Sequence, residues 1–346
     1  MKAILLTKSG GLDEFQIQEV PDPDLKDDEV LIKVKFTVVN GSDIIERKIF
    51  SGERRCLGLE CSGTIEKIGR EVQRWNINDE VCAFVGEGGY AEKVAVPEQQ
   101  VLPLPSNLNL MSAACLPLVA CTVWSELFTT SKLSPLTFWL PENGGPRLST
   151  GETLLVHEDS NGIASFAIQL AKCKRVTTFV ISSKEDYEQY YRDLGADKCF
   201  DYKDFIAREG KALGEGVDVI LDVLGPEHFQ RNLSCLNQQG GRLISIGNFC
   251  TNTMDSTNSL PKVADKKVLH RMIIGAAAFR HRSRQSKESI VREVQENVWP
   301  LIENKMLKRP SYFHSKVFTF SQVEEAHQLM ESSQHFEKIL LVPDDA

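Results

Sequence analysis

The residues from Thr153 to Cys173 could hold an anion, because a short apolar strand pattern is followed directly by a helical one. Thr153 to His157 are mostly β-forming residues, which is typical of a strand covered on both faces. From Gly162 onward apolar residues recur at the spacing of an amphipathic helix. A strand-to-helix turn of this kind places backbone N–H groups and the positive helix end against the pyrophosphate of a dinucleotide. The sequence therefore predicts the first half of a βαβ unit.

The turn itself has fewer glycines than a phosphate-binding turn ordinarily uses. Glycine allows the tight turn, the close approach of the backbone and the close packing of helix on strand. Only Gly162 stands where a glycine run is expected, and Asn161 and Ala164 occupy the flanking positions. Because Asn tolerates left-handed backbone and Ala is small, the turn can still form.

Two carboxylates, Glu158 and Asp159, stand beside the expected pyrophosphate. Like charges several Å apart cost about 1 to 4 kcal/mol at effective dielectric constants of 80 to 20. Two interpretations follow. Either these side chains point away and a dinucleotide binds, or Asp159 or Ser160 caps the helix and nothing binds.

The length and composition predict a folded protein of more than one domain. A chain of 346 residues is too long for one ordinary hydrophobic core, so two domains are expected. Its 42% hydrophobic and 25% charged residues are typical of a soluble globular protein. The net charge of −8 argues against nucleic acid or an anionic membrane as a partner.

The nine cysteines are scattered singly, without a CxxC pair, and no signal peptide or 18-residue apolar run is present. This usage indicates reduced thiols and predicts a cytoplasmic protein without a cysteine metal site.

The first hundred residues predict a small, twisted β domain. Met1 to Leu6, Phe15 to Val20 and Glu29 to Phe36 alternate in polarity and are separated by turn residues, and further strand patterns follow up to Val96. A helical pattern covers about 110 to 129. The loop 131–151 is long, which makes it a lid or a tolerated insertion.

After this loop, strand and helix patterns alternate, which predicts a doubly wound parallel sheet. Strand patterns cover 153–157, 176–182, 198–202, 217–222, 241–246 and 271–274, and helical patterns cover 184–194, about 204–213 and 227–236. The tail predicts one long helix over about 287–304, another over 321–331 and a last strand over 338–342. The fold class is thus α/β, with a twisted β domain and a doubly wound domain.

The order of these motifs resembles the medium-chain dehydrogenase/reductase superfamily, and within it the zinc-free, zeta-crystallin-like quinone oxidoreductases that include the tumour-suppressor-inducible group. The resemblance spans nearly the whole chain, and its main segments are Asn40 to Asp43, Gly58 to Gly63, Asn78 to Val81, Gly88 to Glu92, Ala113 to Pro117, Leu194 to Asp197, Asp218 to Asp222, Glu324 to His327 and Asn297 to Glu303.

This resemblance implies a GroES-like catalytic domain in 1–121, a Rossmann NADPH-binding domain in 122–268 and a C-terminal part, 269–346, that returns to the catalytic domain. It places the active cleft between the domains and implies a homodimer formed at the sheet edge near 271–276. The implied reaction is hydride transfer from NADPH to a quinone or to the β-carbon of an enone.

Zinc is not expected. In the alcohol-dehydrogenase relatives a Cys ligand stands at the position of Asn40 and a His ligand at that of Leu59. Neither an amide nor a leucine side chain serves as a zinc ligand.

The resemblance also assigns site residues. Asn40 and Asp43 would face the nicotinamide and the substrate, and Thr122 would touch the nicotinamide side. Turn and helix-cap chemistry is the alternative explanation of Asn40 and Asp43, and the family context favours the site. The strand that ends at Ser182 is followed by Lys184 rather than by an acid, which favours the 2′-phosphate of NADPH. The same residues also fit a helix start, with Ser182 as the N-cap and Lys184 as a solvated lysine of the first turn. By resemblance the cofactor contacts are Asn40, Thr122, Asn161, Gly162, Ile163, Ser182, Lys184, Tyr202, Gly225, Gly247 and Lys338.

Three positions depart from the family pattern towards bulk or acidic charge: Ala120 in place of a glycine, the turn from Glu158 to Ala164, and Glu337 in place of a glycine before Lys338. An alternative hypothesis is therefore a catalytically weak or inactive relative that acts as a binding or scaffold protein. A second alternative is an enoyl or alkenal reductase of a dedicated pathway.

Overall fold

The computed structural model describes residues 1–49, 52, 54–129, 148–158, 162–182, 186–201, 215–225, 228–238, 240–246, 272–274, 283–307, 316–332 and 338–345. Contacts group the chain into two compact units. Unit 1 comprises Met1–Cys121, Val291–Lys305 and Ser311–Ala346, and unit 2 comprises Thr122–Ile290 and Met306–Pro310. The domain boundaries given above stay a prediction. The mixed α/β fold class is confirmed.

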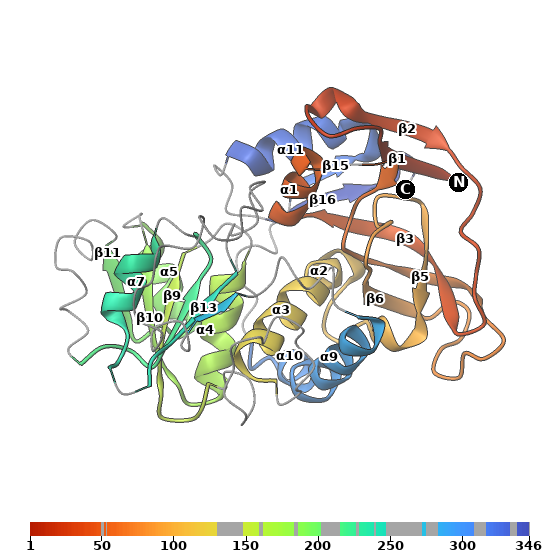
Figure 1. Ribbon diagram of the computed structural model, residues 1–346. Helices are drawn as coiled ribbons and strands as arrows, with labels where there is room; N and C mark the ends of the chain where they lie inside the picture. Colours follow the sequence, from red (N-terminus) through yellow and green to blue (C-terminus); the bar gives the residue numbers. More distant parts are fainter. Residues whose placement is uncertain are drawn as a thin grey trace. The chain divides into compact units, whose positions relative to one another are not determined.

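Unit 1 is built around a long central strand, β3 (Glu29–Val39). In its main sheet the order is β15-β16-β3-β5-β6-β8, and β7 also pairs with β3 (Figure 1). The strands other than β3 are β5 (Glu60–Ile68), β6 (Glu80–Phe84), β7 (Lys93–Pro97), β8 (Val101–Pro103), β15 (Lys316–Thr319) and β16 (Ile339–Val342). A smaller sheet has the order β2-β1-β4, formed by β1 (Lys2–Leu6), β2 (Phe15–Glu19) and β4 (Arg55–Cys56).

The C-terminal strand joins the N-terminal part of unit 1, because β16 pairs antiparallel with β3. Strand β15 was not predicted and pairs parallel with β16. Apolar side chains of β1, β3 and β16 share one buried cluster with α11 (Val323–Ser332), which follows the 3₁₀ turn Phe320–Gln322. Helix α1 (Gly41–Ile49) contacts α11.

Unit 2 contains a six-stranded, all-parallel sheet in the order β11-β10-β9-β12-β13-β14, flanked by helices (Figure 1). Its strands are β9 (Thr153–His157), β10 (Thr177–Ser182), β11 (Lys198–Asp201), β12 (Val219–Asp222), β13 (Arg242–Ser245) and β14 (Met272–Ile274), and its helices include α4 (Ile163–Cys173), α5 (Asp186–Leu194) and α7 (Phe229–Cys235). The predicted doubly wound sheet is confirmed.

The predicted single helix over 287–304 is wrong. Two helices occupy this stretch, α9 (Arg284–Asn297) and α10 (Trp299–Glu303). Pro300 lacks the backbone N–H that a continuous helix would donate to the carbonyl of Glu296, so α9 ends and the chain restarts with Pro300 in the first turn of α10.

Two predictions fall partly or wholly outside the described residues: most of the loop 131–151 and the helix over 204–213. The predicted dimer edge coincides in sequence with β14, which is an end strand of its sheet. The homodimer itself stays a prediction. Among the described residues, no helix combines the length and apolar composition needed to cross a lipid bilayer.

The helical pattern over about 110–129 forms two helices, α2 (Leu110–Ala114) and α3 (Pro117–Leu127). Asn109 caps α2, because its side chain accepts a hydrogen bond of 2.9 Å from the N–H of Ser112. We expect Asn109→Ala to lower the free energy of unfolding by about 1 kcal/mol, whereas Asn109→Asp, which keeps the acceptor, should lower it by clearly less. Urea unfolding of both variants measures this difference, and equal losses would contradict the capping role.

Candidate functional site

A buried polar network lies in unit 1 where three strands meet, and the strand register explains why. Asn40 directly follows β3, Glu60 begins β5 and Lys338 directly precedes β16. Thr37 of β3 pairs with Cys61 of β5, and Val39 of β3 pairs with Ile339 of β16. The antiparallel pairing therefore brings the three polar residues together at the end of β3 and the beginnings of β5 and β16.

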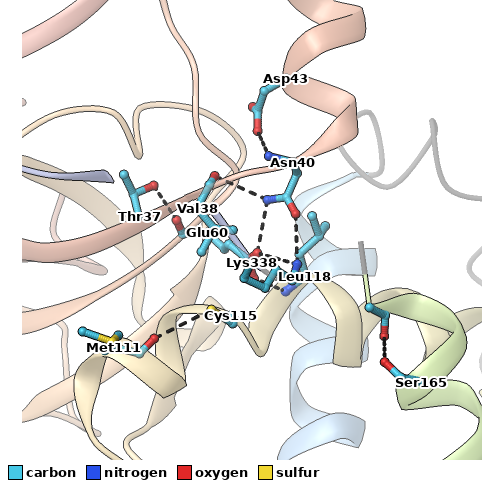
Figure 2. A network of polar contacts seen from close by, with 11 residues as sticks. Thr37, Val38, Asn40, Asp43, Glu60, Met111, Cys115, Leu118, Ser165 and Lys338 are labelled. Atoms are coloured by element: carbon cyan, nitrogen blue, oxygen red, sulfur yellow. Dashed lines mark hydrogen bonds and ion pairs between the residues drawn. The ribbon is translucent and has the colours of Figure 1, made fainter. Parts of the chain in front are cut away.

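Figure 2 shows how the side chains of this network face one another. The Lys338 ammonium lies 3.2 Å from Asn40 Oδ1 and 3.7 Å from Glu60 Oε1. Asn40 Nδ2 donates to Glu60 Oε1 at 3.1 Å, and the N–H of Leu118 donates to Glu60 Oε2 at 2.8 Å. Since Leu118 lies in the first turn of α3, the Glu60 carboxylate also sits at the positive end of a helix.

Both charged members of the network are withdrawn from water: Glu60 is 0% exposed and Lys338 is 3% exposed. Burial raises the pKa of the Glu60 carboxyl, while the Lys338 ammonium and the hydrogen bonds from Leu118 and Asn40 act in the opposite direction. In an ion pair buried to this degree, each charge offsets the cost of removing the other from water, since neither has water as an alternative partner.

Asn40 uses its side-chain amide within this network. Nδ2 donates to Glu60 and, at 3.4 Å, to the carbonyl of Val38, while Oδ1 accepts from Lys338. An amide has two N–H donors and an oxygen with two lone pairs. What Asn40 has left for a ligand is therefore an acceptor, not a donor.

Asp43 is placed by helix capping. It is 0% exposed, and its carboxylate accepts the N–H of Asn40 at 2.9 Å and that of Gly58 at 3.2 Å. As the third residue of α1 it reaches back to the residue before the helix, as in a capping box. The structure thus brings Asp43 to Asn40 through the backbone. A contact of either residue with a substrate stays a prediction.

Asn40 and Leu59, which the resemblance places at the zinc-ligand positions of the alcohol-dehydrogenase relatives, present neither a thiolate nor an imidazole. The amide of Asn40 is engaged by Glu60 and Lys338, and Leu59 is a buried apolar residue. Within the described part of the chain, no cluster of three or more His, Cys, Asp or Glu residues is arranged to hold a metal ion.

In unit 2 the strand-to-helix turn ends in the geometry that a phosphate-binding turn uses. Gly162, immediately before α4, has a φ of 84°, in the left-handed region that favours glycine. Its carbonyl accepts from the N–H of Phe166 and from the hydroxyl of Ser165. Strands β9 and β12 are neighbours in the sheet, so this turn lies where the strand order reverses, which is where such sheets bind ligands.

A second polar group lies at the carboxyl ends of β9, β12 and β13. His157 ends β9 and lies 2.8 Å, Nε2 to Oδ1, from Asn232. Asp222 ends β12 and accepts from the N–H groups of Leu224 and Gly225 and, at 3.1 Å, from the hydroxyl of Ser245.

This group contains buried polar atoms with unused hydrogen-bonding capacity. Within the described part of the chain, His157 Nδ1 and Asn232 Nδ2 have no hydrogen-bond partner. Burial lowers the pKa of His157, and the Asp222 carboxylate only partly opposes this. His157 is therefore neutral near pH 7 and presents an unused ring nitrogen at the ligand-binding edge of the sheet.

The hydroxyl of Ser182, the predicted contact of a 2′-phosphate, is hydrogen-bonded to a carboxylate. This hydroxyl donates to Glu158 Oε2 at 2.5 Å, and the N–H of Glu158 donates to the carbonyl of Ile181 at 2.9 Å. Of the two acidic residues in the turn, Glu158 is thus directed along the sheet edge to the end of β10. Asp159 lies outside the described residues.

The structure groups the predicted site residues only in part. It brings Asn40, Asp43 and Lys338 together in unit 1, and it places Gly162, Ile163, Ser182 and Gly225 at the carboxyl edge of the sheet in unit 2. Thr122 is a buried residue of α3 in unit 2. Asn161, Lys184, Tyr202 and Gly247 lie outside the described residues.

Sequence reasoning assigned no role to Glu60, His157 or Asp222. The signal for Glu60 was available, because a carboxylate inside a strand pattern must be paired when it is buried. The signal for His157 and Asp222 was their position, since each is the polar last residue of an apolar parallel strand. Their partners Asn232 and Ser245 come from distant parts of the sequence, which no local pattern identifies.

Two family models match the chain. A model described as "Alcohol dehydrogenase GroES-like domain" matches residues 26–106, and one described as "Zinc-binding dehydrogenase" matches residues 194–341.

Among curated proteins, a synaptic vesicle membrane protein VAT-1 homolog-like from Mus musculus is 26% identical over 357 residues, covering 99% of this chain and 81% of the relative. A highly reducing polyketide synthase from Didymella fabae is 27% identical over 350 residues. The match covers 99% of this chain but only 17% of the synthase.

Among solved structures, a mycobacterial protein complexed with NADPH superimposes with a TM-score of 0.78 at 21% identity, covering 99% of this chain and all of the other. A quinone oxidoreductase from Pseudomonas syringae superimposes with a TM-score of 0.78 at 20% identity, covering 99% of both chains. At this level of identity the likenesses show the fold.

Proposed function

Because the chain belongs to the medium-chain dehydrogenase/reductase superfamily, in its quinone oxidoreductase-like branch, we propose that it transfers hydride from a nicotinamide dinucleotide to quinones or α,β-unsaturated carbonyl compounds. The neighbouring structures include a quinone oxidoreductase and an enoyl reductase. The name of the first states a quinone as the acceptor, and the name of the second states an enoyl group.

The observation that carries the proposal is the left-handed Gly162 between β9 and α4, at the point where the strand order of unit 2 reverses. A pyrophosphate there would meet the N-terminus of an eleven-residue helix. His157 Nδ1, a buried atom without a partner among the described residues, lies at the same strand ends. These features fit a dinucleotide.

A bound nicotinamide dinucleotide would supply the hydride. Asn40 Oδ1 would accept a hydrogen bond from the bound ligand. Lys338, which donates to this oxygen, and Glu60, which accepts from Asn40 Nδ2, would fix the orientation of the amide. The Lys338 ammonium is paired with the Glu60 carboxylate, so it adds no net charge to the site, and its part is to hold Asn40 Oδ1 in place. We propose that the reaction needs no zinc, because Asn40 and Leu59 are not zinc ligands.

Two observations favour a second candidate, a relative that binds ligands or partners with weak or no catalysis. Both donors of the Asn40 amide are already used, and the hydroxyl of Ser182 donates to Glu158. The sequence predicts NADPH from Ser182 and Lys184, but the hydrogen bond from Ser182 to Glu158 does not support a preference for NADPH over NADH.

Nucleotide binding and turnover separate these candidates. We expect NADH or NADPH, added at about 100 times a micromolar Kd, to stabilise the protein by about 2.7 kcal/mol, and a benzoquinone or a 2-alkenal to be reduced. Thermal unfolding and the absorbance of the reduced nucleotide at about 340 nm measure the two effects.

Variants at Gly162 provide the control. Gly162→Asn, which tolerates left-handed backbone, should keep most of the stabilisation, whereas Gly162→Val should lose it. Binding without turnover of any quinone or enone would favour the non-catalytic candidate. The absence of stabilisation by either nucleotide would refute the reductase.

A further inference from the structure

We propose that Glu158 is a specificity-determining residue that disfavours the 2′-phosphate of NADPH, so that the protein binds NADH at least as tightly as NADPH. This inference rests on the proposed function, because it concerns the dinucleotide site of that function.

The strand register puts the Glu158 carboxylate at an unexpected place. Glu158 follows β9 in sequence, but His157 pairs with Ile181, so Glu158 lies opposite Ser182 at the end of β10. Two hydrogen bonds fix it there: its N–H donates to the carbonyl of Ile181, and its Oε2 accepts from the hydroxyl of Ser182 at 2.5 Å. An acid that directly follows β9 thus lies at the end of β10.

The end of the second strand is where dinucleotide-binding folds choose between the two cofactors. A carboxylate there accepts hydrogen bonds from the ribose hydroxyls of NADH, whereas NADPH needs cationic or hydroxyl groups for its phosphate. Because Glu158 comes from the preceding strand, the sequence after Ser182 does not reveal it.

Ser182 strengthens the discrimination. A serine hydroxyl has a single proton, and here it points to Glu158. A 2′-phosphate that took this proton would lie within a few Å of the carboxylate, and Ser182 is only 5% exposed. Like charges at that distance repel more strongly where water is excluded.

The test compares the wild type with Glu158→Gln, which keeps the length of the side chain and its acceptor oxygen but removes the charge. Isothermal titration with 2′,5′-ADP and 5′-AMP reports on the phosphate alone, without the nicotinamide or turnover, and titration with NADPH and NADH follows. We expect Glu158→Gln to tighten NADPH and 2′,5′-ADP by about tenfold or more, and to change NADH and AMP by less than about threefold.

Glu152→Gln is the matched control. Glu152 precedes β9 at the opposite end of the same strand, where it pairs with Arg242, so this variant removes the same charge away from the site. It should leave the ratio of NADPH to NADH affinity unchanged. Salt should weaken the effect of Glu158→Gln, because screening reduces the repulsion that it relieves.

The outcomes distinguish the two claims. If the wild type prefers NADPH strongly, or if Glu158→Gln binds NADPH no more tightly than the wild type does, the inference about Glu158 is wrong and the dinucleotide site stands. If neither protein binds any of the four nucleotides, the proposed function fails and the inference fails with it.

Discussion

Replacing Lys338 by methionine is expected to lower the free energy of unfolding by about 3 to 5 kcal/mol, because the buried carboxylate of Glu60 would lose its cation. Methionine fills much of the volume of the lysine stem, so the loss reports the missing charge more than a cavity. Urea unfolding followed by fluorescence measures it. Lys316→Met, the same substitution at an exposed position on β15, should change stability by less than about 0.5 kcal/mol.

The double variant Lys338→Met, Glu60→Gln separates the ion pair from the packing. The glutamine side chain would still accept from the N–H of Leu118 while carrying no charge, so most of the lost stability should return. If the double variant is as unstable as Lys338→Met alone, the lysine stem rather than its charge stabilises unit 1.

The pH dependence gives an independent signature of the same charge. Burial already raises the pKa of Glu60, and without Lys338 the shift becomes larger. A carboxyl whose pKa is higher in the folded than in the unfolded state destabilises the fold as the pH rises above the unfolded value. The deficit of Lys338→Met relative to the wild type should therefore shrink as the pH falls towards about 4.5. A deficit that does not vary with pH would contradict an uncompensated Glu60.

Lys338 also illustrates what the sequence could and could not predict. Periodicity identified the parallel sheet of unit 2 and the strand that follows Lys338, because both rest on local patterns that packing reinforces. The role of Lys338 depends on a register between β16 and β3, which are about 300 residues apart in sequence, and on Glu60 from a third strand. The sequence therefore predicted a functional lysine and missed its partner.

Glu158 shows the same limit at the other candidate site. Its acidic charge was recognised from the sequence, but the sequence left open whether its side chain points towards the pyrophosphate or away from it. Only the pairing of β9 with β10 places it on Ser182. Helix boundaries failed for a local reason instead, since the break before Trp299 follows from Pro300, a signal that was present in the sequence.

Acid is expected to destabilise unit 1 through His327. This side chain is 0% exposed, and its Nε2 lies 3.1 Å from the hydroxyl of Tyr90. Burial, with a further contribution from Arg47, lowers its pKa from 6.5 to about 3. Below pH 6.5 His327 is therefore protonated in the unfolded chain but stays neutral in the folded protein. The free energy of unfolding falls as the pH falls from 6.5 towards 3.

The size of this loss follows from the shift. Between pH 7 and pH 5 the free energy of unfolding should fall by about 2 kcal/mol because of His327 alone. In His327→Gln, which keeps a donor for Tyr90 and does not titrate, the pH dependence should be weaker by this amount. Urea unfolding at the two pH values measures it, and the remaining slope in the variant contains the contribution of His157, whose pKa burial also lowers. Equal slopes in the two proteins would refute the assignment.

The groups around His327 explain why the fold does not relieve this cost. Arg47 of α1, whose guanidinium pairs with Glu331 of α11, is a cation that acts on the ring, and Tyr90, which contacts the ring, donates a hydrogen bond to the Asp43 carboxylate. Since Tyr90 donates to Asp43, the hydroxyl oxygen of Tyr90 accepts from Nε2–H of a neutral His327. The same carboxylate caps the N–H of Asn40, so Asp43 links Tyr90, the hydrogen-bond partner of His327, to the turn that presents Asn40. Acid unfolding that begins at His327 should therefore release Asn40 together with α1. The protection factor of the N–H of Asn40, which corrects for the slower intrinsic exchange in acid, should fall over the same pH range in the wild type but not in His327→Gln.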